Sequence, residues 1–234
     1  MLEIADVHVY LGKSHILQGV NLEVGKTLVS LIGRNGMGKT SLCKTIMGLF
    51  PVAEGSIRYR GIEIAGKKPY EIARLGLGYV PQGRRIFPSL TVDEHLRLTD
   101  RREAAGGVWT IERVYELFPG LAERKQNLGA NLSGGEQQML AIGRVLAANP
   151  SMLILDEPTE GIAPALIETL IQVFHHIVSE QIGILMIEQN LHVATSLADS
   201  VSIMVNGRIL MQMESERLLR DEDAKNQLLG VSSA

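Results

Sequence analysis

The stretch that decides the fold is GRNGMGKT, residues 33–40, which directly follows the apolar segment TLVSLI at 27–32 and opens a helical pattern. It fits G-x-x-x-x-G-K-[ST], the spacing of a phosphate-binding loop. Its glycines let the backbone curl so that successive N–H groups point at phosphate oxygens, and the helix start adds the positive end of its dipole. We predict that the bound nucleotide contacts Gly33, Arg34, Asn35, Gly36, Met37, Gly38, Lys39, Thr40 and Ser41.

Two side chains of this loop have separate expected roles. Lys39 would bridge the β and γ phosphates, and the Thr40 hydroxyl would ligate Mg²⁺. The alternative is a glycine-rich turn between strand and helix that exists for structural reasons alone, and the position of the loop after a buried strand argues against it. The motif predicts a nucleotide but no particular reaction, because kinases, GTPases and ATPases share it.

Composition restricts the setting in which this site works. A chain of 234 residues with 45% hydrophobic content can bury one substantial core, so we expect one unit over residues 1–234. A net charge of -3 provides no overall basic field for nucleic acid or acidic lipid. One cysteine, Cys43, and no secretion signal at the start indicate a reducing cytosol. No apolar run approaches the roughly 18 to 20 residues that cross a bilayer, so any membrane role would be peripheral.

The hydrophobic pattern predicts an α/β fold with a mostly parallel sheet. Near-continuous apolar runs, typical of buried parallel strands, occur at 27–32, 152–155, 183–187 and 201–205, and helical patterns at 39–48, 164–180 and 190–198. Alternating patterns at 2–9, 16–24 and 56–64 predict an N-terminal antiparallel β subdomain. From about 85 to 148 the pattern is helical, with helices at 91–99, 110–118 and 134–148, a loop at 103–109 and no clear strand, which predicts an inserted helical subdomain.

A second pair of polar residues ends the strand at 152–155. Asp156 is the expected second anchor of Mg²⁺, and Glu157 is the candidate to polarise the water that attacks the γ-phosphate. The alternative is a solvated turn in which Pro158 only ends the strand. Ligands of α/β folds bind at the carboxyl ends of parallel strands, which favours the functional interpretation.

The segment LSGGEQQ, residues 132–138, opens another helix. Ser133 and Glu136 have the spacing of a capping box, which accounts for the helix start. A capping box does not account for Gly134 and Gly135, since each lowers helix propensity by up to about 1 kcal/mol. Glycines at a helix start allow an anion to approach the backbone closely.

Taken in order, GRNGMGKT, LSGGEQQ and MLILDEP resemble the motifs of the ATP-binding-cassette (ABC) ATPases over essentially the whole chain. The resemblance implies a P-loop NTPase (RecA-like) core, ATP and Mg²⁺ as ligands, and two ATPase subunits packed head to tail. It also implies that Ser133, Gly134, Gly135 and Glu136 of one subunit approach the nucleotide of the other.

The same resemblance assigns further residues. Tyr10 matches the aromatic residue that stacks on adenine, and Gln82 matches the glutamine that senses Mg²⁺ and water. In ILMIEQN, residues 184–190, Gln189 stands where most members carry a histidine, which makes it a neutral sensor of phosphate and water. The alternative is that Gln189 caps the next helix, a task that Asn190 suits better. A second departure is Ala163, where the family usually has aspartate.

The combination of VPQGRRIFPSLTV, LSGGEQQMLAIGR, EPTEGIAP and EQN is similar to the LivF-like subgroup that serves branched-chain amino acid uptake. Urea or amide importers are close relatives of this subgroup. The partners so implied are a second ATPase subunit, transmembrane permease subunits and, indirectly, an extracytoplasmic solute-binding protein. The chain itself would be cytoplasmic and peripheral, on the inner face of the cell membrane. The expected permease contact is the segment Arg84, Arg85, Ile86, Phe87 and Pro88, and solvated charge or lipid contact is the alternative for its arginines.

Two other classes of function are alternatives. A soluble ABC ATPase could act as an assembly scaffold or on nucleic acid, although the chain lacks a basic and aromatic stripe for nucleic acid. A phosphoryl-transferring kinase would have no use for the glycines of LSGGEQQ. We therefore expect an ATPase that drives solute import and binds no nucleic acid.

Overall fold

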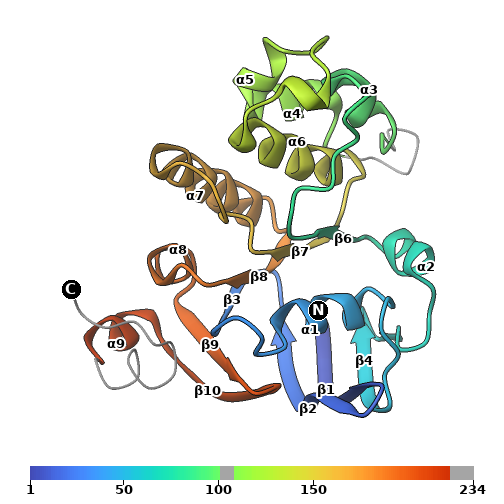
Figure 1. Cartoon of the computed structure of the whole chain (residues 1–234), viewed down its shortest axis with the longest axis vertical. Coiled ribbons are helices and arrows are strands. Elements are labelled where there is room, and N and C mark those ends of the chain that lie inside the picture. Colours follow the sequence, from blue (N-terminus) through green and yellow to red (C-terminus); the bar gives the residue numbers. More distant parts are fainter. Residues whose placement is uncertain (101–107, 222–234) are drawn as a thin grey trace.

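A six-stranded sheet runs through the middle of the molecule (Figure 1). This computed structural model describes residues 1–100 and 108–221. The strand order is β10-β9-β3-β8-β7-β6; all neighbours pair parallel except β10, which is antiparallel to β9. The strands are β3 (Leu28–Ile32), β6 (Leu77–Val80), β7 (Met152–Asp156), β8 (Gly183–Glu188), β9 (Ser200–Val205) and β10 (Arg208–Glu214). The predicted α/β class with a mostly parallel sheet is confirmed, whereas β10 was not anticipated.

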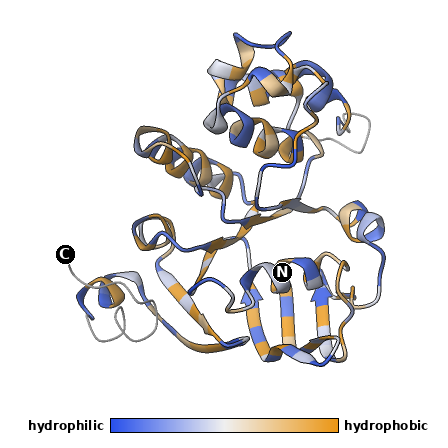
Figure 2. Cartoon of the chain, viewed as in Figure 1, coloured by the Kyte–Doolittle hydropathy of each residue, from blue (hydrophilic) through white to orange (hydrophobic). Residues whose placement is uncertain are grey.

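An antiparallel sheet of the N-terminal segment packs below it, in the order β2-β1-β4-β5. Its strands are β1 (Leu2–Leu11), β2 (Ser14–Val24), β4 (Glu54–Tyr59) and β5 (Ile62–Glu63). Figure 2 shows apolar and polar residues alternating along β1, β2 and β4, as expected for a sheet with one buried face. The prediction of one strand over 56–64 is wrong, because Arg60 and Gly61 both have positive φ (54° and 77°) and turn the chain into a hairpin.

Helix α1 (Lys39–Ile46) lies between the two sheets and buries Leu42, Cys43 and Ile46 in a core shared with both. It ends two residues before the predicted position 48, because Gly48 takes a positive φ of 70° and the N–H of Leu49 bonds back to Lys44 O at 2.8 Å. The other helices of the core are α7 (Pro164–Ser179) and α8 (Leu191–Leu197). Two short helices were not anticipated, α2 (Pro69–Arg74) and α9 (Ser215–Arg220).

The remaining helices gather on the far side of the parallel sheet (Figure 1). They are α3 (Val92–Arg97), α4 (Ile111–Leu117), α5 (Pro119–Ala122), a 3₁₀ turn at Gly129–Asn131 and α6 (Gly134–Ala147). Their apolar side chains share one core with α7 and with one face of β6, β7 and β8. The helices predicted at 91–99, 110–118 and 134–148 agree to within two residues at each end. Of the loop predicted at 103–109, residues 103–107 lie outside the described residues.

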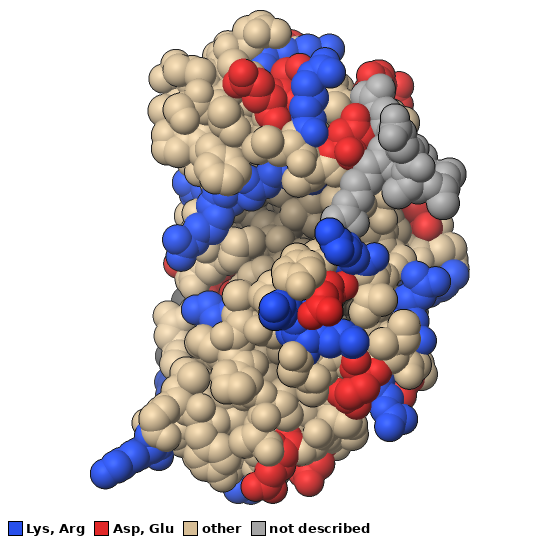
Figure 3. All heavy atoms as spheres, turned by 90° about the vertical axis from the view of Figure 1, so that its right-hand side faces the viewer, with Lys and Arg blue, Asp and Glu red and all other residues tan. Residues whose placement is uncertain are grey.

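Among the described residues, no helix combines the length and the apolar character needed to cross a bilayer. On the face that carries α2 and β6, Figure 3 shows Lys and Arg side chains interspersed with Asp and Glu.

Candidate nucleotide site

Three neighbouring parallel strands place the candidate residues at one edge of the sheet. β3, β8 and β7 pair in register, with Ile32 opposite Glu188 and Ile187 opposite Asp156. Their carboxyl ends therefore meet, as in other α/β ligand sites. A cavity of about 250 Å³ opens there, lined by Ile16, Asn35, Gly36, Gly38, Lys39, Thr40, Ser41, Gln82 and Glu157.

The phosphate loop connects β3 to α1 through backbone conformations that favour glycine. Gly36 and Gly38 have φ angles of 80° and 103°. A Cβ on Gly33 would lie 2.4 Å from the carbonyl oxygen of Met204, so the close approach of β9 excludes any side chain. The loop thus curls around the start of α1, where the first N–H groups of the helix have no carbonyl partner within the helix.

Lys39 crosses the inside of this loop. Its Nζ donates to the carbonyl oxygens of Gly33 (2.7 Å) and Arg34 (3.1 Å) and lies 3.5 Å from Oε1 of Glu157. The side chain is only 4% exposed, so its charge is held in the cavity by these partners. A buried ammonium with oxygen partners on two sides is suited to receive a triphosphate.

Asp156 and Thr40 provide oxygens suited to a divalent cation. Thr40 Oγ1 donates to Asp156 Oδ1 at 3.0 Å, and the Tyr79 hydroxyl donates to Oδ2 at 3.2 Å. Burial raises the pKa of Asp156, against the effect of both hydrogen bonds. Mg²⁺ typically takes one or two protein oxygens and completes its shell with phosphate and water. A hydroxyl beside a carboxylate fits that pattern, and the described residues hold no group of three or more His, Cys, Asp or Glu side chains placed to hold a metal ion.

Glu157 stands at the centre of the polar contacts. Its Oε2 accepts hydrogen bonds from the side-chain amides of Gln189 (2.7 Å) and Gln82 (3.3 Å), and its Oε1 faces Lys39. The residue has a positive φ of 52°, a strained conformation for a non-glycine residue that turns the chain away from β7. Its N–H bonds Ile187 O of β8 at 2.9 Å, which fixes the turn. Three donors therefore hold this carboxylate beside the cavity and offset its repulsion by Asp156.

Glu188 explains the polar end of β8. It is 2% exposed, and its Oε1 accepts the N–H and hydroxyl of Thr159 at 3.1 and 2.7 Å. Its Oε2 accepts the N–H groups of Gln189 (3.1 Å) and Asn190 (3.3 Å). Burial raises the pKa of Glu188, and these four hydrogen bonds oppose that effect. Glu188 ties the loop after β7 to the loop after β8, which sets the distance between Glu157 and Gln189.

We expect Glu188→Ala to lower the free energy of unfolding by about 3–5 kcal/mol, because it leaves four donors without their acceptor. Thr159→Val, the matched control, removes one of these bonds and should cost about 1 kcal/mol. Urea unfolding of both variants measures the two values. Equal values for the two variants would show that Glu188 does not organise this pair of loops.

The two residues after Glu188 divide their tasks as expected. Asn190 caps α8, since its Oδ1 accepts the N–H of Val193 at 3.3 Å. Gln189 is therefore free to contact Glu157. Gln82 lies on the Glu157 side of the cavity, where its amide nitrogen also bonds Glu160 at 2.9 Å, and no hydrogen bond joins it to the Thr40–Asp156 pair.

The start of α6 lies apart from this cavity. Ser133 and Glu136 form the predicted capping box, with Glu136 N 3.3 Å from Ser133 Oγ and Ser133 N 2.7 Å from Glu136 Oε2. Close packing explains why glycine occupies positions 134 and 135. A Cβ on Gly134 would lie 2.9 Å from the Arg84 guanidinium, and one on Gly135 would lie 2.3 Å from the Leu166 side chain. None of residues 133–136 lines the cavity beside Lys39.

Tyr10 lies near the cavity as part of a stack of rings. Its ring packs flat on His15 at 4.1 Å between centroids, and His15 in turn stacks on His8 at 5.2 Å. Ile16, the next residue of β2, lines the cavity. Tyr10 is 43% exposed, so much of its ring is accessible to solvent.

Sequence reasoning missed four residues of this site: Tyr79, Thr159, Glu160 and His15. A lone tyrosine or histidine in a strand gives no signal, because packing is its commoner role. At Ala163, where aspartate was expected from the resemblance, α7 begins with no side-chain cap and with Pro164 at its first position.

Comparison with known proteins agrees with this geometry. The family described as "ABC transporter" matches residues 17–160. The chain is 40% identical to the high-affinity branched-chain amino acid transport ATP-binding protein BraG of Pseudomonas aeruginosa, over 98% of this chain and all of that protein. It is 31% identical to the probable branched-chain amino acid transport ATP-binding protein LivF of Archaeoglobus fulgidus, over 93% of each. A crystal structure of a nucleotide-free ATP-binding cassette from an ABC transporter superimposes with a TM-score of 0.85 at 23% identity, covering 100% of this chain and 99% of that one.

Proposed function

Because the chain belongs to the ABC transporter family of ATPases, which couple ATP hydrolysis to transport, we propose that it drives the import of branched-chain amino acids. The observation that carries the ATPase part of the proposal is the set of contacts made by Glu157. This buried carboxylate is held beside the phosphate loop by Lys39, Gln82 and Gln189. The similarity to BraG and LivF supports this solute over urea or an amide.

In this proposal the cavity binds MgATP through the phosphate loop. The N–H groups of residues 33–41 and the Lys39 ammonium hold the phosphates, while Thr40 and Asp156 hold Mg²⁺. When bound, Mg²⁺ neutralises charge that develops on the transferring phosphoryl group. Tyr10 offers its exposed ring surface to the adenine, and His15 supports that ring from behind.

Glu157 is the residue that orients the attacking water and accepts its proton. Gln189 and Gln82 both donate to Oε2 of Glu157. The other carboxylate oxygen, Oε1, faces Lys39. When Lys39 engages phosphate, the Glu157 carboxylate becomes available to water next to the γ-phosphate. The two amides act as positioning residues for Glu157.

We predict that Gln189→His changes turnover by less than about tenfold, since a ring N–H can replace the amide donor and tenfold corresponds to about 1.4 kcal/mol. The variant should gain a pH dependence near the ordinary histidine pKa of about 6.5. Gln189→Leu, which has no donor, should lose more turnover than the histidine variant. A loss of a hundredfold or more in Gln189→His would show that the amide makes a contact that histidine cannot reproduce. Steady-state ATPase assays across pH 6 to 8 measure these effects.

We further propose that Ser133, Gly134, Gly135 and Glu136 act on the nucleotide of a second ATPase subunit. This is supported by the absence of residues 133–136 from the lining of their own subunit's cavity and by the hydrogen-bonded cap of α6. The 14-residue helix directs the positive end of its dipole outward from this capped start. The partner is a second copy of this chain or a related subunit.

The proposed contact with the transmembrane permease is the segment 84–88. Phe87 is 50% exposed and Pro88 is exposed, whereas Arg84 turns inward and donates to Gly161 O at 3.4 Å. Backbone strain marks this segment, since Arg84 and Arg85 have positive φ angles of 65° and 49°. Docking there places the chain on the inner face of the cell membrane, where the extracytoplasmic solute-binding protein acts on it only through the permease.

Co-purification with its permease subunits, followed by reconstitution in lipid vesicles, tests this function. We expect ATP hydrolysis to rise when a solute-binding protein loaded with leucine is enclosed in the vesicles. Stimulation by a urea-loaded binding protein alone would favour the urea or amide importer. Purification without any permease would favour the soluble scaffold.

A further inference from the structure

A second and larger hollow lies at the opposite edge of the parallel sheet. Its volume is about 470 Å³, within the range of about 300–1,000 Å³ typical of small-molecule sites. Much of its lining comes from the amino-terminal ends of β3, β7 and β8, joined by residues 1, 59, 60, 108 and 109, whereas the nucleotide cavity lies at the other ends of these strands. A strand of five or six residues spans about 17–20 Å, so the two hollows are separate.

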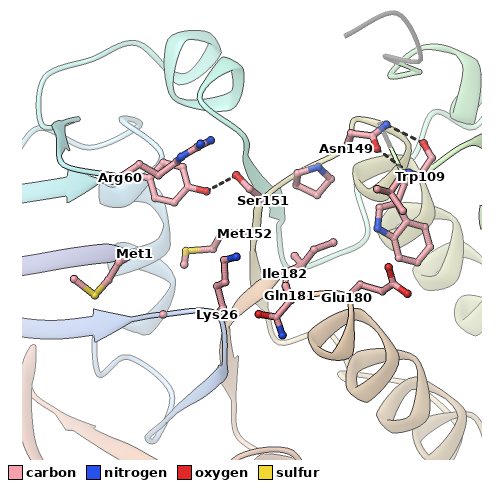
Figure 4. A pocket seen from close by; sticks show the side chains of 14 residues that line it. Met1, Lys26, Arg60, Trp109, Asn149, Ser151, Met152, Glu180, Gln181 and Ile182 are labelled. Carbon is pink, nitrogen blue, oxygen red and sulfur yellow. Dashed lines mark hydrogen bonds between the residues drawn. The ribbon is translucent and has the colours of Figure 1, made fainter. Parts of the chain in front are cut away.

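Trp109 lies in this hollow with an unused donor. The residue is 2% exposed, and its indole N–H has no hydrogen-bond acceptor among residues 1–100 and 108–221. Figure 4 shows the indole nitrogen on the side of the ring that faces the hollow. A buried N–H without an acceptor is unfavourable, so native structures seldom keep one without a reason.

The position of Trp109 is fixed by its neighbours. Asn149 has a left-handed conformation with a φ of 53°. Its Oδ1 accepts the backbone N–H of Trp109 at 2.7 Å, and its side-chain amide donates to the Trp109 carbonyl at 2.8 Å. The Arg113 guanidinium lies 4.7 Å from the centre of the indole ring and pairs with Glu180 at 2.8 Å. These contacts hold the indole N–H toward the hollow.

The charged side chains that line the hollow differ in whether they have an ion-pair partner. Glu180 is paired with Arg113, whereas neither Lys26 nor Arg60 has a hydrogen bond or an ion pair from its side chain to a described residue. Figure 4 shows both cations across the hollow from Trp109, with Met152 beside Lys26 and Ile182 between Lys26 and Trp109. The groups without a partner among the described residues are thus two cations, Lys26 and Arg60, and one neutral donor, the indole N–H of Trp109. They lie beside an apolar surface.

We propose that this hollow binds a small organic carboxylate with an apolar chain. The carboxylate accepts the indole N–H of Trp109, the positive charges of Lys26 and Arg60 across the hollow favour an anion there, and the chain packs on Ile182 toward Met152. A free amino acid fits less well, because its ammonium would meet two cations while the nearby carboxylate is already paired.

Trp109 is the only tryptophan of the chain, so it reports on its own site. Titration of the full-length ¹⁵N-labelled protein with 4-methylpentanoate should shift its single indole N–H resonance downfield and change tryptophan fluorescence, both with saturation. The uncharged 4-methylpentanamide and L-leucine are matched ligands, and each should bind at least about tenfold more weakly.

Lys26→Gln and Arg60→Gln should each weaken binding about three- to fivefold, since each cation acts on the carboxylate across the hollow and not through a direct contact. Lys13→Gln, which removes an exposed lysine of the β1–β2 hairpin, is the matched control and should bind normally. No saturable shift up to about 50 mM, a concentration at which binding would be worth less than about 2 kcal/mol, would overturn the proposal. Unchanged binding by the Lys26→Gln, Arg60→Gln double variant, or equal binding of the amide or leucine, would also overturn it.

Discussion

Replacing Glu157 by glutamine is expected to lower ATP turnover by a factor on the order of 10² to 10⁴ while leaving ATP binding intact, because general base catalysis contributes about that much. An amide of the same shape keeps the contacts of the cavity but accepts no proton. Glu157 has a positive φ of 52°. We expect the glutamine to keep this backbone conformation, so the loop after β7 should keep its path. Bound ATP should therefore persist and trap the closed pair of subunits.

Phosphate release and gel filtration in MgATP measure the two parts of this prediction. Glu160→Gln is the matched control, since it removes a carboxylate of the same loop that also accepts from Gln82 but does not contact Lys39. We expect the control to keep turnover within about tenfold of the parent protein. Turnover of Glu157→Gln equal to that of the control would remove Glu157 from its role.

Replacing Lys39 by alanine is expected to weaken ATP binding by about 10- to 100-fold, because hydrogen bonds to a charged group contribute about 1.5–3 kcal/mol. The ammonium is the charge in the cavity that faces both the loop carbonyls and Glu157. Its loss also leaves Glu157 next to Asp156 without a compensating cation, which adds repulsion toward the incoming triphosphate.

Equilibrium binding of a fluorescent ATP analogue measures this loss. Lys44→Ala is the matched control; Lys44 lies on the same helix, but its ammonium faces the ring of Phe50 at 5.5 Å. The control should bind the analogue normally. If Lys39→Ala also bound it normally, the loop would hold phosphate through its backbone alone.

Much of the fold could be predicted because its buried strands are continuous apolar runs. β3, β7, β8 and β9 lie within a residue or two of their predicted positions. The split between β4 and β5 could not be foreseen, since it depends on Arg60 adopting a conformation that arginine rarely takes. Helices α2 and α9 have six residues each, too few for a helical period to stand out.

The phosphate loop, Asp156 and Glu157 were predictable because each is placed by a short motif at the end of a strand. The partners of Glu157 were not, since the contact between Gln189 and Glu157 depends on the order of β7 and β8 in the sheet. The role of Glu188 was hidden for the same reason: its partner Thr159 lies 29 positions away and comes close only when both strands pair.

The central claim is that the triphosphate held by residues 33–41 of one subunit also contacts residues 133–135 of the other. The most direct test is a structure of the Glu157→Gln protein, assembled with its permease partners and held in MgATP. We predict that Ser133 and the N–H groups of Gly134 and Gly135 lie within hydrogen-bonding distance of a γ-phosphate bound across the subunit interface. A fully occupied complex in which the start of α6 stays remote from every triphosphate would contradict the account.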